Sequence, residues 1–248
     1  IKHLSNFHLP ALRYVTNTGQ RLPKNVILRL MKALPNIDIY SMYGLTECKR
    51  VAYLPPAKLM QKPESVGKAM PNTEAFIIDD TGDRIEEPGK TGELIVRGGS
   101  LMIEYWKKPD ETKKAIKEGD FPGDRWLYTG DLFKMDEDGD LYFCGRKDDI
   151  IKTLGEKVSP KEVENVLFKL EDVVEAAVVG IPNEISGQMI KAVVSLREDS
   201  PLTEKDIIRQ CHRYLGSFMI TKHVEIRPSL PLSPNGKEEK KRLVSEHT

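Results

Sequence analysis

The sequence predicts a mixed α/β and α+β chain: a partial parallel α/β sheet, then a small antiparallel β-barrel, then a compact α+β domain. Three observations predict this fold. A strand–helix–strand pattern fills residues 1–65, short β-runs separated by glycine turns fill residues 66–147, and two capped helices alternate with strands over residues 148–248. We expect these three ranges to be three structural parts, the first of them the end of a larger α/β domain.

The first part has the pattern of a βαβ unit. Residues 12–16 form a short β-run that ends before Gly19, and residues 37–43 form a second one. Between them, Lys24–Leu34 carries apolar side chains at helical spacing, directly after Pro23. A strand, a helix and a second strand in this order are typical of a parallel sheet.

The second part is expected to consist of β-strands and turns. Residues 75–78 and 93–97 are short apolar runs, and residues 132–135 and 140–144 flank Asp138-Gly139. An Asp-Gly pair between two β-runs is a strong hairpin signal. Short strands joined by such turns favour a small barrel or sandwich.

The third part mixes short hairpins with two capped helices. Gly155 makes a tight turn between two β-runs, residues 150–153 and 156–158. Ser159-Pro160-Lys161-Glu162 supplies an N-cap, a first-turn proline and a capping-box acid, and Thr203 with Asp206 begins the second capped helix. Further strands are expected at residues 174–181, 192–196 and 224–227, and the charge run Lys237–Arg242 is interpreted as a solvated helix face.

Composition and charge exclude several classes of protein. Apolar residues make up 39% of the 248 residues and charged residues 31%, which indicates a globular protein. The 38 basic and 38 acidic residues cancel, so nothing favours nucleic acid as a partner. No apolar run approaches the roughly 20 residues of a transmembrane segment. Three scattered cysteines, Cys48, Cys144 and Cys211, match no metal spacing and favour a reducing, cytoplasmic location.

The C-terminal region contains a lysine on a turn. Pro231-Leu232-Ser233-Pro234-Asn235-Gly236-Lys237 combines two prolines with an Asn-Gly pair, which predicts a tight turn that presents Lys237. An ammonium on a long stem suits an anionic group that develops during a reaction. Taken alone, such a motif is more often a plain surface turn.

A second motif, Tyr43-Gly44-Leu45-Thr46-Glu47, is predicted to lie just past a parallel strand, where open α/β sheets bind their ligands. Glycine lets the backbone approach a ligand, the Thr46 hydroxyl can bond phosphate, and the Glu47 carboxylate can hold Mg²⁺. The alternative is a strand-end turn with a solvated acid. These residues alone favour neither reading.

Two further motifs follow. Asp131 comes directly after Thr129-Gly130 and is expected to open the hairpin. A fixed carboxylate that accepts from two adjacent hydroxyls is a common grip on ribose. Arg146 could bond the same sugar or a phosphate. Taken singly, these residues also fit an ordinary acid in a glycine turn and a surface ion pair. Asp148 and Asp149 lie between the second and third parts, where two like charges favour an exposed junction that is either a hinge or a plain linker.

Four motifs together resemble, in order and spacing, those of the adenylate-forming (AMP-binding) superfamily: Tyr43–Glu47, Tyr128–Asp131, Gly145–Asp149 and the Lys237 turn. That superfamily contains acyl- and aryl-CoA synthetases, the adenylation domains of peptide synthetases, and firefly luciferase. The resemblance extends from Thr18 to Leu243. The sequence around Gly92–Ile95 and Leu141–Glu164 makes an acyl-CoA synthetase the favoured member.

The resemblance implies a role for each motif residue. Tyr43 would stack on adenine, with Gly19 lining the same pocket and Phe143 packing near the base. Thr46 would contact phosphate, and Glu47 would hold Mg²⁺. Asp131 and Arg146 would bond the ribose, and Asp148 would be the hinge of a mobile C-terminal domain. Lys152 and Gly155 would border the pantetheine channel of the thioester step. Lys237 would be the catalytic lysine that reaches the α-phosphate and the carboxylate.

The resemblance also implies a reaction. An acyl-CoA synthetase activates a small-molecule carboxylic acid with ATP to an acyl-adenylate, then transfers the acyl group to CoA and releases AMP. Two alternatives stay open: an adenylation domain that loads the pantetheine arm of a carrier protein, and a nucleotide-binding module without catalysis.

Two departures from the family pattern limit what this chain does by itself. Asn17–Arg21 stands where the family carries a run of small residues, and the Ser/Thr/Gly-rich phosphate loop is absent from the sequence. The chain also begins at Ile1 with a strand soon after. We therefore expect it to be a piece of a longer protein, without most of the N-terminal domain of the same chain, and to be inactive alone.

Overall fold

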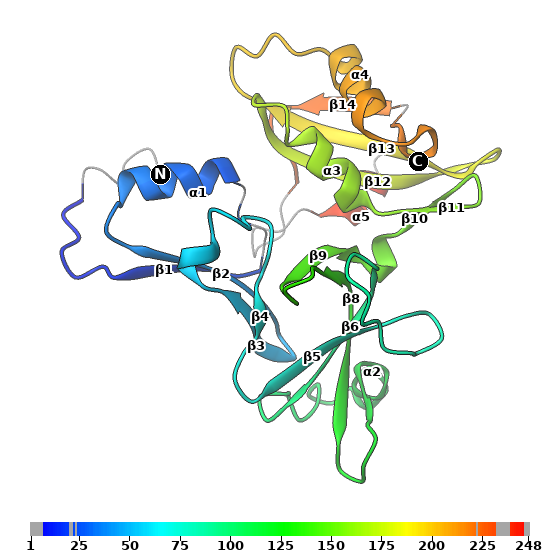
Figure 1. The fold of residues 1–248 in the computed structure, drawn as a ribbon. Coiled ribbons are helices and arrows are strands. Elements are labelled where there is room, and N and C mark those ends of the chain that lie inside the picture. The colour runs from blue at the N-terminus through cyan, green and yellow to red at the C-terminus, as the bar shows by residue number, and fades with distance from the viewer. Residues whose placement is uncertain (1–6, 20–21, 23, 222, 232–238, 246–248) are drawn as a thin grey trace. The chain divides into compact units, whose positions relative to one another are not determined.

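The computed structural model describes residues 7–19, 22, 24–221, 223–231 and 239–245 (Figure 1). The chain divides into two compact units, Ile1–Phe143 and Cys144–Thr248. Its described strands form one four-stranded sheet and two five-stranded sheets. The division at residues 65/66 and 147/148 that the sequence suggested stays a proposal.

The four-stranded sheet of the first unit has the order β1-β2-β3-β4. Its β1 (Tyr14–Asn17) and β2 (Asp38–Leu45) are parallel, and α1 (Lys24–Ala33) connects them, as the sequence predicted. Figure 1 shows α1 over these strands. The apolar stripe of α1 packs on the sheet because Ile27 is buried in one cluster with Ile39, Leu54 and Leu59.

The strand β2 is longer than predicted. It continues through Leu45 and turns at Thr46 and Glu47 into the antiparallel β3 (Cys48–Leu54), with Leu45 paired to Cys48. The motif Tyr43–Glu47 therefore forms a strand end and a two-residue hairpin turn, and not a loop after the strand. The short β4 (Lys68–Ala69) pairs with β3, after the 3₁₀ turn η2 (Pro56–Lys58).

The five-stranded sheet that follows has β8 (Arg125–Met135) near its centre. The order is β5 (Thr73–Ile78), β6 (Gly92–Gly98), β8 and β7 (Ile116–Glu118), and β9 (Leu141–Arg146) also pairs with β8. The helix α2 (Pro109–Ala115) precedes β7. The predicted hairpin at Asp138-Gly139 is confirmed, but the predicted barrel is wrong in one respect. It is not closed, because no described pairing joins β5 to β7 or β9.

The two sheets of the first unit share a core. One buried cluster combines side chains of β3 with side chains of β5, β6 and β8, among them Val51, Ile77, Leu94, Leu127 and Phe133. Tyr43 and Leu45 of β2 also pack against this core, which fixes the end of β2 relative to the middle of β8 and so positions the candidate site.

The second unit is a compact α+β domain, as predicted. Its sheet has the order β11-β10-β13-β12, with β14 parallel to β13. The elements are the 3₁₀ turn η3 (Lys147–Asp149), β10 (Ile151–Thr153), β11 (Glu156–Val158), α3 (Pro160–Leu167), β12 (Val173–Asn183), β13 (Gly187–Leu196), α4 (Glu204–Tyr214), the 3₁₀ turn η4 (Ser217–Met219), β14 (His223–Arg227) and α5 (Lys240–Ser245).

Both faces of this sheet are covered. Ala176 and Val178 of β12 face a core that also contains side chains of α3 and α4, whereas Ala177 and Val179 pack with Leu243 of α5 (Figure 1). The alternation follows from the two-residue period of a strand.

One predicted helix cap is wrong and one is confirmed. Pro160 begins α3, but the Ser159 side chain makes no cap bond to this helix. Its hydroxyl donates instead to the carbonyl oxygen of Cys144 at 2.6 Å, so it ties β9 to the helix start. By contrast, Thr203 and Asp206 form the predicted capping box of α4.

The charge run Lys237–Arg242 lies partly outside the described residues. Of its described members, Lys240 does not lie on a solvated face, because its Nζ is 2.7 Å from Oε1 of the buried Glu164. Among the described helices, none has the length and apolar character needed to cross a bilayer.

Candidate nucleotide-binding site

Two residues that the sequence predicted for nucleotide binding are joined directly. The hydroxyl of Tyr43 on β2 donates to Oδ2 of Asp131 on β8 at 2.5 Å. The ring of Tyr43 packs edge-on against Phe133, with centroids 4.8 Å apart, and Phe133 packs in the same way against Phe143 at 5.5 Å. The predicted adenine and ribose residues Tyr43, Asp131 and Phe143 therefore lie together around the buried Phe133.

Asp131 is held by an irregularity in β8 that the sequence did not predict. Glu93 pairs with Leu132 while Ile95 pairs with Tyr128, so three residues of β8 lie opposite the single residue Leu94. Gly130 takes the positive φ of 67° that this bulge requires. Asp131 is thus mid-strand, and not at the opening of the hairpin as predicted.

Side chains fix the bulge on both sides. The Thr129 hydroxyl donates to the carbonyl oxygen of Leu94 at 2.8 Å and accepts from the backbone N–H of Asp131 at 3.1 Å. The backbone N–H of Gly130 donates to Oε1 of Glu93 at 3.1 Å. Thr129, Asp131 and Glu93 are all buried, so the Asp131 carboxylate has little freedom to move.

The Thr46–Glu47 turn is also held closely. A Cβ on Gly44 would lie 2.1 Å from the backbone oxygen of Lys49, so only glycine fits where β2 meets β3. Thr46 is exposed and Glu47 is half-buried. The hydroxyl of Tyr105 donates a short hydrogen bond to Oε1 of Glu47.

The oxygen atoms of this turn fit a Mg²⁺ ion by their chemistry. Mg²⁺ prefers oxygen ligands and commonly binds through one or two carboxylates together with substrate phosphates. An ionised carboxylate has about four lone-pair positions. The bond from Tyr105 uses one of them at Glu47 and leaves coordination capacity on that side chain.

Gly19 follows the end of β1, on the same edge of the sheet. Asn17 pairs with Ser41 in the parallel register, two residues before Tyr43. Gly19 has a φ of 90°, and a Cβ built there would meet no atom within 4 Å. This arrangement agrees with the rule that open α/β sheets bind ligands at the carboxyl ends of their strands.

The remaining predicted residues belong to the second unit, which is described by itself. Arg146 and Asp148 are exposed at the end of β9 and in η3. Lys152 is exposed on β10, and its backbone N–H donates to Oε1 of Gln188 at 2.7 Å. Gly155 forms the β10–β11 turn with a φ of 83°. Lys237 lies outside the described residues.

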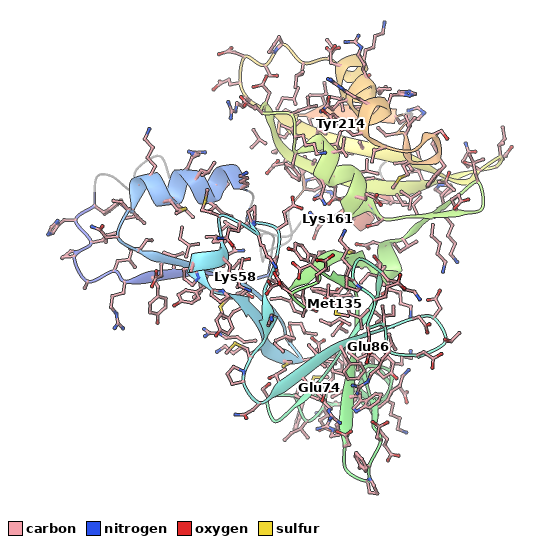
Figure 2. The ribbon with its side chains drawn as sticks, in the orientation of Figure 1. Lys58, Glu74, Glu86, Met135, Lys161 and Tyr214 are labelled. Atoms are coloured by element: carbon pink, nitrogen blue, oxygen red, sulfur yellow. The ribbon has the colours of Figure 1, made fainter. Side chains whose placement is uncertain are left out.

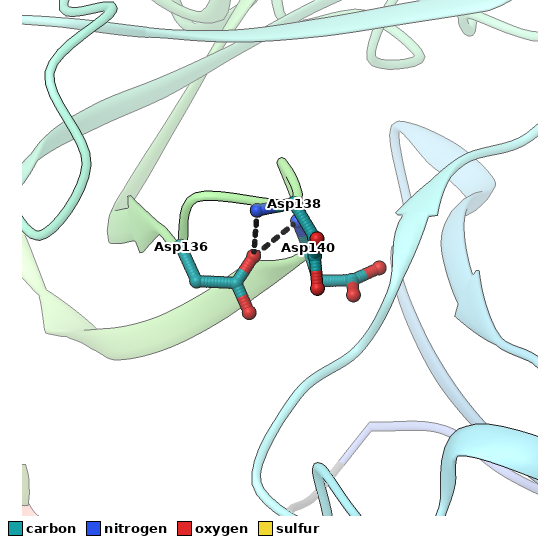
Figure 3. Close-up of side chains that lie close together, drawn as sticks. All are labelled: Asp136, Asp138 and Asp140. Atoms are coloured by element: carbon teal, nitrogen blue, oxygen red, sulfur yellow. Dashed lines mark hydrogen bonds between the residues drawn. The ribbon is translucent and has the colours of Figure 1, made fainter.

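A cluster of three aspartates lies in the first unit, away from the predicted motifs. Asp136, Asp138 and Asp140 form the β8–β9 turn, and one carboxylate oxygen from each lies within 4.8 Å of the others. Figure 3 shows Oδ1 of Asp136 accepting from the backbone N–H groups of Asp138 and Asp140, at 3.1 and 2.9 Å.

A lysine ammonium takes the position that a cation would fill in this cluster. Nζ of Lys62 lies 2.6 Å from a carboxylate oxygen of each of the three aspartates. Lys58 on η2, labelled in Figure 2, adds a second ammonium at 3.1 Å from Asp140. The network therefore ties the loop before β4 to the start of β9, and we do not assign it as a metal site.

The close contacts in this network shift the pKa values of its members. Burial opposes the charge on Asp136, but bonds from Lys62, the Asp140 backbone and Tyr142 outweigh it and lower the pKa of Asp136 to about 2. The three aspartates raise the pKa of Lys62. Burial and the hydrogen bond to Asp136 raise the pKa of Tyr142 to about 12.

Two residues that support the site, Glu93 and Tyr105, and one that supports the aspartate cluster, Lys62, were not predicted from the sequence. Glu93 lies 37 positions before its partner Gly130, Tyr105 lies 58 positions after Glu47, and Lys62 lies 74 positions before Asp136. No motif marks Tyr105 or Lys62, because their partners are remote in sequence. The Asp136–Asp140 spacing was visible, but only the structure identifies the ammonium that it binds.

Known proteins match the chain over both units. The family model described as AMP-binding enzyme matches residues 2–106, and the model described as AMP-binding enzyme C-terminal domain matches residues 162–237. A long-chain-fatty-acid–CoA ligase of Yersinia pestis is 41% identical over 99% of the chain and 42% of its own length. The ligase of the same name from Bacillus subtilis is 31% identical over 99% of the chain and 42% of its own length.

Solved structures agree. The amide bond synthetase McbA from Marinactinospora thermotolerans has a TM-score of 0.88 at 29% identity, over 99% of this chain and 49% of that one. The o-succinylbenzoate CoA synthetase MenE from Bacillus subtilis, solved with an acyl-adenylate intermediate, has a TM-score of 0.81 at 28% identity, over 96% and 47%. The chain thus spans less than half the length of these relatives. These matches, on a fold that joins Tyr43 to Asp131, show that the chain belongs to the AMP-binding family of adenylate-forming enzymes.

Proposed function

We propose that the whole protein is an AMP-forming acyl-CoA synthetase that activates a long-chain fatty acid with ATP and transfers it to CoA. The observation that carries this proposal is the hydrogen bond between Tyr43 and Asp131, which brings together the ring proposed to stack on adenine and the carboxylate proposed to bind the ribose. The names of the Yersinia pestis and Bacillus subtilis relatives supply the acid and the acceptor.

In the first half-reaction an oxygen of the fatty carboxylate attacks the α-phosphorus of ATP. The new bond joins the carboxylate oxygen to phosphorus, the bond to the β-phosphate oxygen breaks, and pyrophosphate leaves. Tyr43 would stack on adenine, and Asp131 would accept from the ribose hydroxyls, so the α-phosphate has one position. Gly19 and Phe143 would line the same pocket, and Arg146 would add a second donor to the ribose.

The two negatively charged reactants repel each other, so the site must supply positive charge. Mg²⁺ bound to the phosphates would offset part of their charge. Glu47 would hold that ion, and Thr46 would donate its hydroxyl to a phosphate oxygen. Lys237 would bring its ammonium to the carboxylate and the α-phosphate.

In the second half-reaction the thiolate of CoA attacks the acyl carbon. A thioester bond forms, the bond to the AMP oxygen breaks, and the thiol proton passes to solvent. A rotation at Asp148 would exchange the Lys237 turn for the β10–β11 turn, in which Lys152 and Gly155 would border the pantetheine channel. The exposure of Asp148 and the open space around Gly155 support these roles.

The experiment is acid-dependent ATP–pyrophosphate exchange by the full-length protein, with fatty acids from acetate to palmitate. We expect exchange to be strongest with the long-chain acids, and the 248-residue chain to give none because it has no phosphate loop. Robust exchange by this chain alone would refute its predicted inactivity. Absence of exchange by the full-length protein with every acid would refute the proposed activity.

The acyl acceptor is tested separately. Full-length protein supplied with acyl-adenylate is offered CoA, a carrier protein with its pantetheine arm, or an amine. The amine is included because one structural relative is titled an amide bond synthetase. We expect acyl-CoA as the main product. Preference for the carrier protein would support the alternative that the sequence left open.

The cytoplasmic location also remains a proposal. Cys48, Cys144 and Cys211 form no disulfide, as expected in a reducing compartment. Fractionation of cells that express the full-length protein tests it, and recovery in an oxidising compartment would contradict it.

A further inference from the structure

A short segment after β6 holds the Thr46–Glu47 turn at three points. Oγ of Ser100 lies 3.1 Å from Sγ of Cys48, and the backbone N–H of Met102 donates to the carbonyl oxygen of Glu47 at 2.7 Å. The hydroxyl of Tyr105 donates to Oε1 of the same Glu47. We call Ser100–Tyr105 the clasp segment, since it fixes the backbone and the carboxylate of Glu47 together.

The clasp segment is itself anchored. The backbone N–H of Tyr105 donates to Oγ1 of Thr112 on α2 at 2.9 Å, and the backbone N–H of Lys108 donates to the carbonyl oxygen of Tyr105 at 3.0 Å. The Arg125 guanidinium donates to the carbonyl oxygen of Ile103 at 2.5 Å. The Tyr105 hydroxyl is therefore attached to a fixed backbone and does not depend on a free loop for its position.

A hydroxyl that donates to a carboxylate decides which oxygen of that carboxylate remains for other ligands. Such bonds to an ionised acceptor are stronger than bonds between neutral groups. Carboxylates that ligate metals are commonly oriented by a hydrogen bond of this kind, and removal of the orienting partner typically weakens metal binding.

We propose that Tyr105 is a positioning residue that orients the Glu47 carboxylate for Mg²⁺. The inference rests on the proposed function, in which Glu47 holds the ion. It adds the residue that sets the orientation and predicts how the enzyme depends on metal when that residue is changed. Tyr105 acts through Glu47 and does not itself contact the metal or the substrate.

The test compares Tyr105→Phe with Tyr14→Phe in the full-length protein. Phenylalanine keeps the ring and removes only the hydroxyl that bonds Glu47. Tyr14 is a matched control because it is a half-exposed tyrosine on β1 whose contacts are with Arg13 and Tyr40. Free Mn²⁺ is followed by electron paramagnetic resonance in the presence of ATP, and ATP–pyrophosphate exchange is measured against Mg²⁺ concentration.

We expect Tyr105→Phe to weaken Mn²⁺ binding and to raise the Mg²⁺ requirement by about 10- to 100-fold. The exchange rate at saturating Mg²⁺ should stay close to that of the unchanged protein, and thioester formation from supplied acyl-adenylate should be unaffected. A metal dependence equal to that of Tyr14→Phe would overturn the inference.

Two further measurements separate the possible failures. Thr112→Val leaves the Tyr105 hydroxyl in place but removes the hydroxyl that accepts from the Tyr105 backbone N–H. It should shift the metal dependence in the same direction by a smaller factor. This variant keeps the inference testable if Tyr105→Phe does not fold, and no shift would count against it. Glu47→Gln should abolish the metal dependence that Tyr105 tunes.

If Glu47→Gln leaves that dependence unchanged, the metal role of Glu47 fails, and the inference fails with it. Hydrogen exchange over residues 43–48 then reports on the clasp itself. Faster exchange in Tyr105→Phe than in Tyr14→Phe shows that Tyr105 still fixes the turn, so that the failure lies in the metal role proposed for Glu47. Equal exchange refutes the clasp as well.

Discussion

The hydroxyl of Tyr43 and the carboxylate of Asp131 meet at 2.5 Å across 88 positions of sequence. Tyr43 lies near the end of β2 in the four-stranded sheet, and Asp131 lies in the bulge of β8 in the neighbouring antiparallel sheet. Their bond therefore couples two sheets at the proposed adenosine site.

Removal of the Tyr43 hydroxyl should weaken nucleotide binding. Tyr43→Phe retains the ring that is proposed to stack on adenine but removes the hydroxyl that donates to Asp131. A hydrogen bond to a charged group contributes about 1.5–3 kcal/mol, so KM for ATP in the full-length protein should rise roughly 10- to 100-fold. Tyr214→Phe in the second unit is the control, and equal KM values for the two variants would show that the bond does not shape the site.

The network around Lys62 should make the first unit sensitive to acid. The pKa of Asp136 is lowered from 3.8 to about 2 in the folded protein, so the stabilisation is present above about pH 4 and is lost as the pH falls towards 2. The contribution is on the order of 2 kcal/mol. Trp106 and Trp126, the two tryptophans of the chain, both lie in the first unit, so fluorescence-detected unfolding reports on it.

Lys62→Met tests the origin of this dependence. The variant should be clearly less stable than the unchanged chain at pH 6, because three carboxylates within 4.8 Å then repel one another. The difference should shrink as the pH falls from about 4 towards 2, because protonation relieves the repulsion in the variant and progressively removes the attraction to Lys62 in the unchanged chain. A difference of the same size at pH 6 and pH 2.5 would mean that Lys62 stabilises the unit by packing and not by charge.

Glu164 should be a major contributor to the stability of the second unit. Its buried carboxylate accepts from the backbone N–H of Val178 at 3.1 Å and from Lys161 and Lys240 at 3.2 and 2.7 Å. Figure 2 labels Lys161 on α3. Glu164→Ala leaves two ammonium groups without their acid and should cost about 3 kcal/mol.

The control for Glu164 is Arg209→Ala, because the Arg209–Asp206 pair lies on an exposed face of α4. That substitution should cost less than about 0.5 kcal/mol. Calorimetry measures the unfolding of the second unit in each variant. Hydrogen exchange at the Val178 amide then shows whether the loss of stability is centred on the Glu164 network. A cost for Glu164→Ala no larger than that of the control would contradict the assigned network.

Lys237 should serve one half-reaction only. In the full-length protein, Lys237→Ala should reduce acid-dependent ATP–pyrophosphate exchange by at least about 100-fold, since it removes the ammonium that is proposed to offset the reacting charges. Thioester formation from supplied acyl-adenylate should stay largely intact. Equal loss of both half-reactions would count against a role confined to adenylation.

Local patterns in the sequence predicted most of the fold. The helical spacing in Lys24–Leu34 gave α1, and Thr203 with Asp206 gave the start of α4, because both signals lie within a few residues. The predicted cap at Ser159 is wrong because the Ser159 hydroxyl donates to the carbonyl oxygen of Cys144, 15 positions away in the sequence. Tertiary partners override a local cap in a way that the sequence does not display.

The sequence predicted which residues make up the candidate site, but not how they are arranged in space. The motifs named Tyr43 and Asp131, yet nothing local indicates the bulge that aims Asp131 or the bond that joins it to Tyr43. Tyr105 was invisible for the same reason, since its partner Glu47 lies 58 positions away. Contacts across such separations depend on how two sheets share one core.

The most direct measurement is product analysis of the full-length protein with ATP, palmitate and CoA, beside the variant Asp131→Ala. We expect AMP, pyrophosphate and palmitoyl-CoA in equal amounts, and a fall of at least about 100-fold in kcat/KM for ATP in the variant, since the proposed role of Asp131 is to accept charged hydrogen bonds from the ribose. Formation of ADP in place of AMP, or an Asp131→Ala enzyme as efficient as the unchanged one, would contradict this expectation.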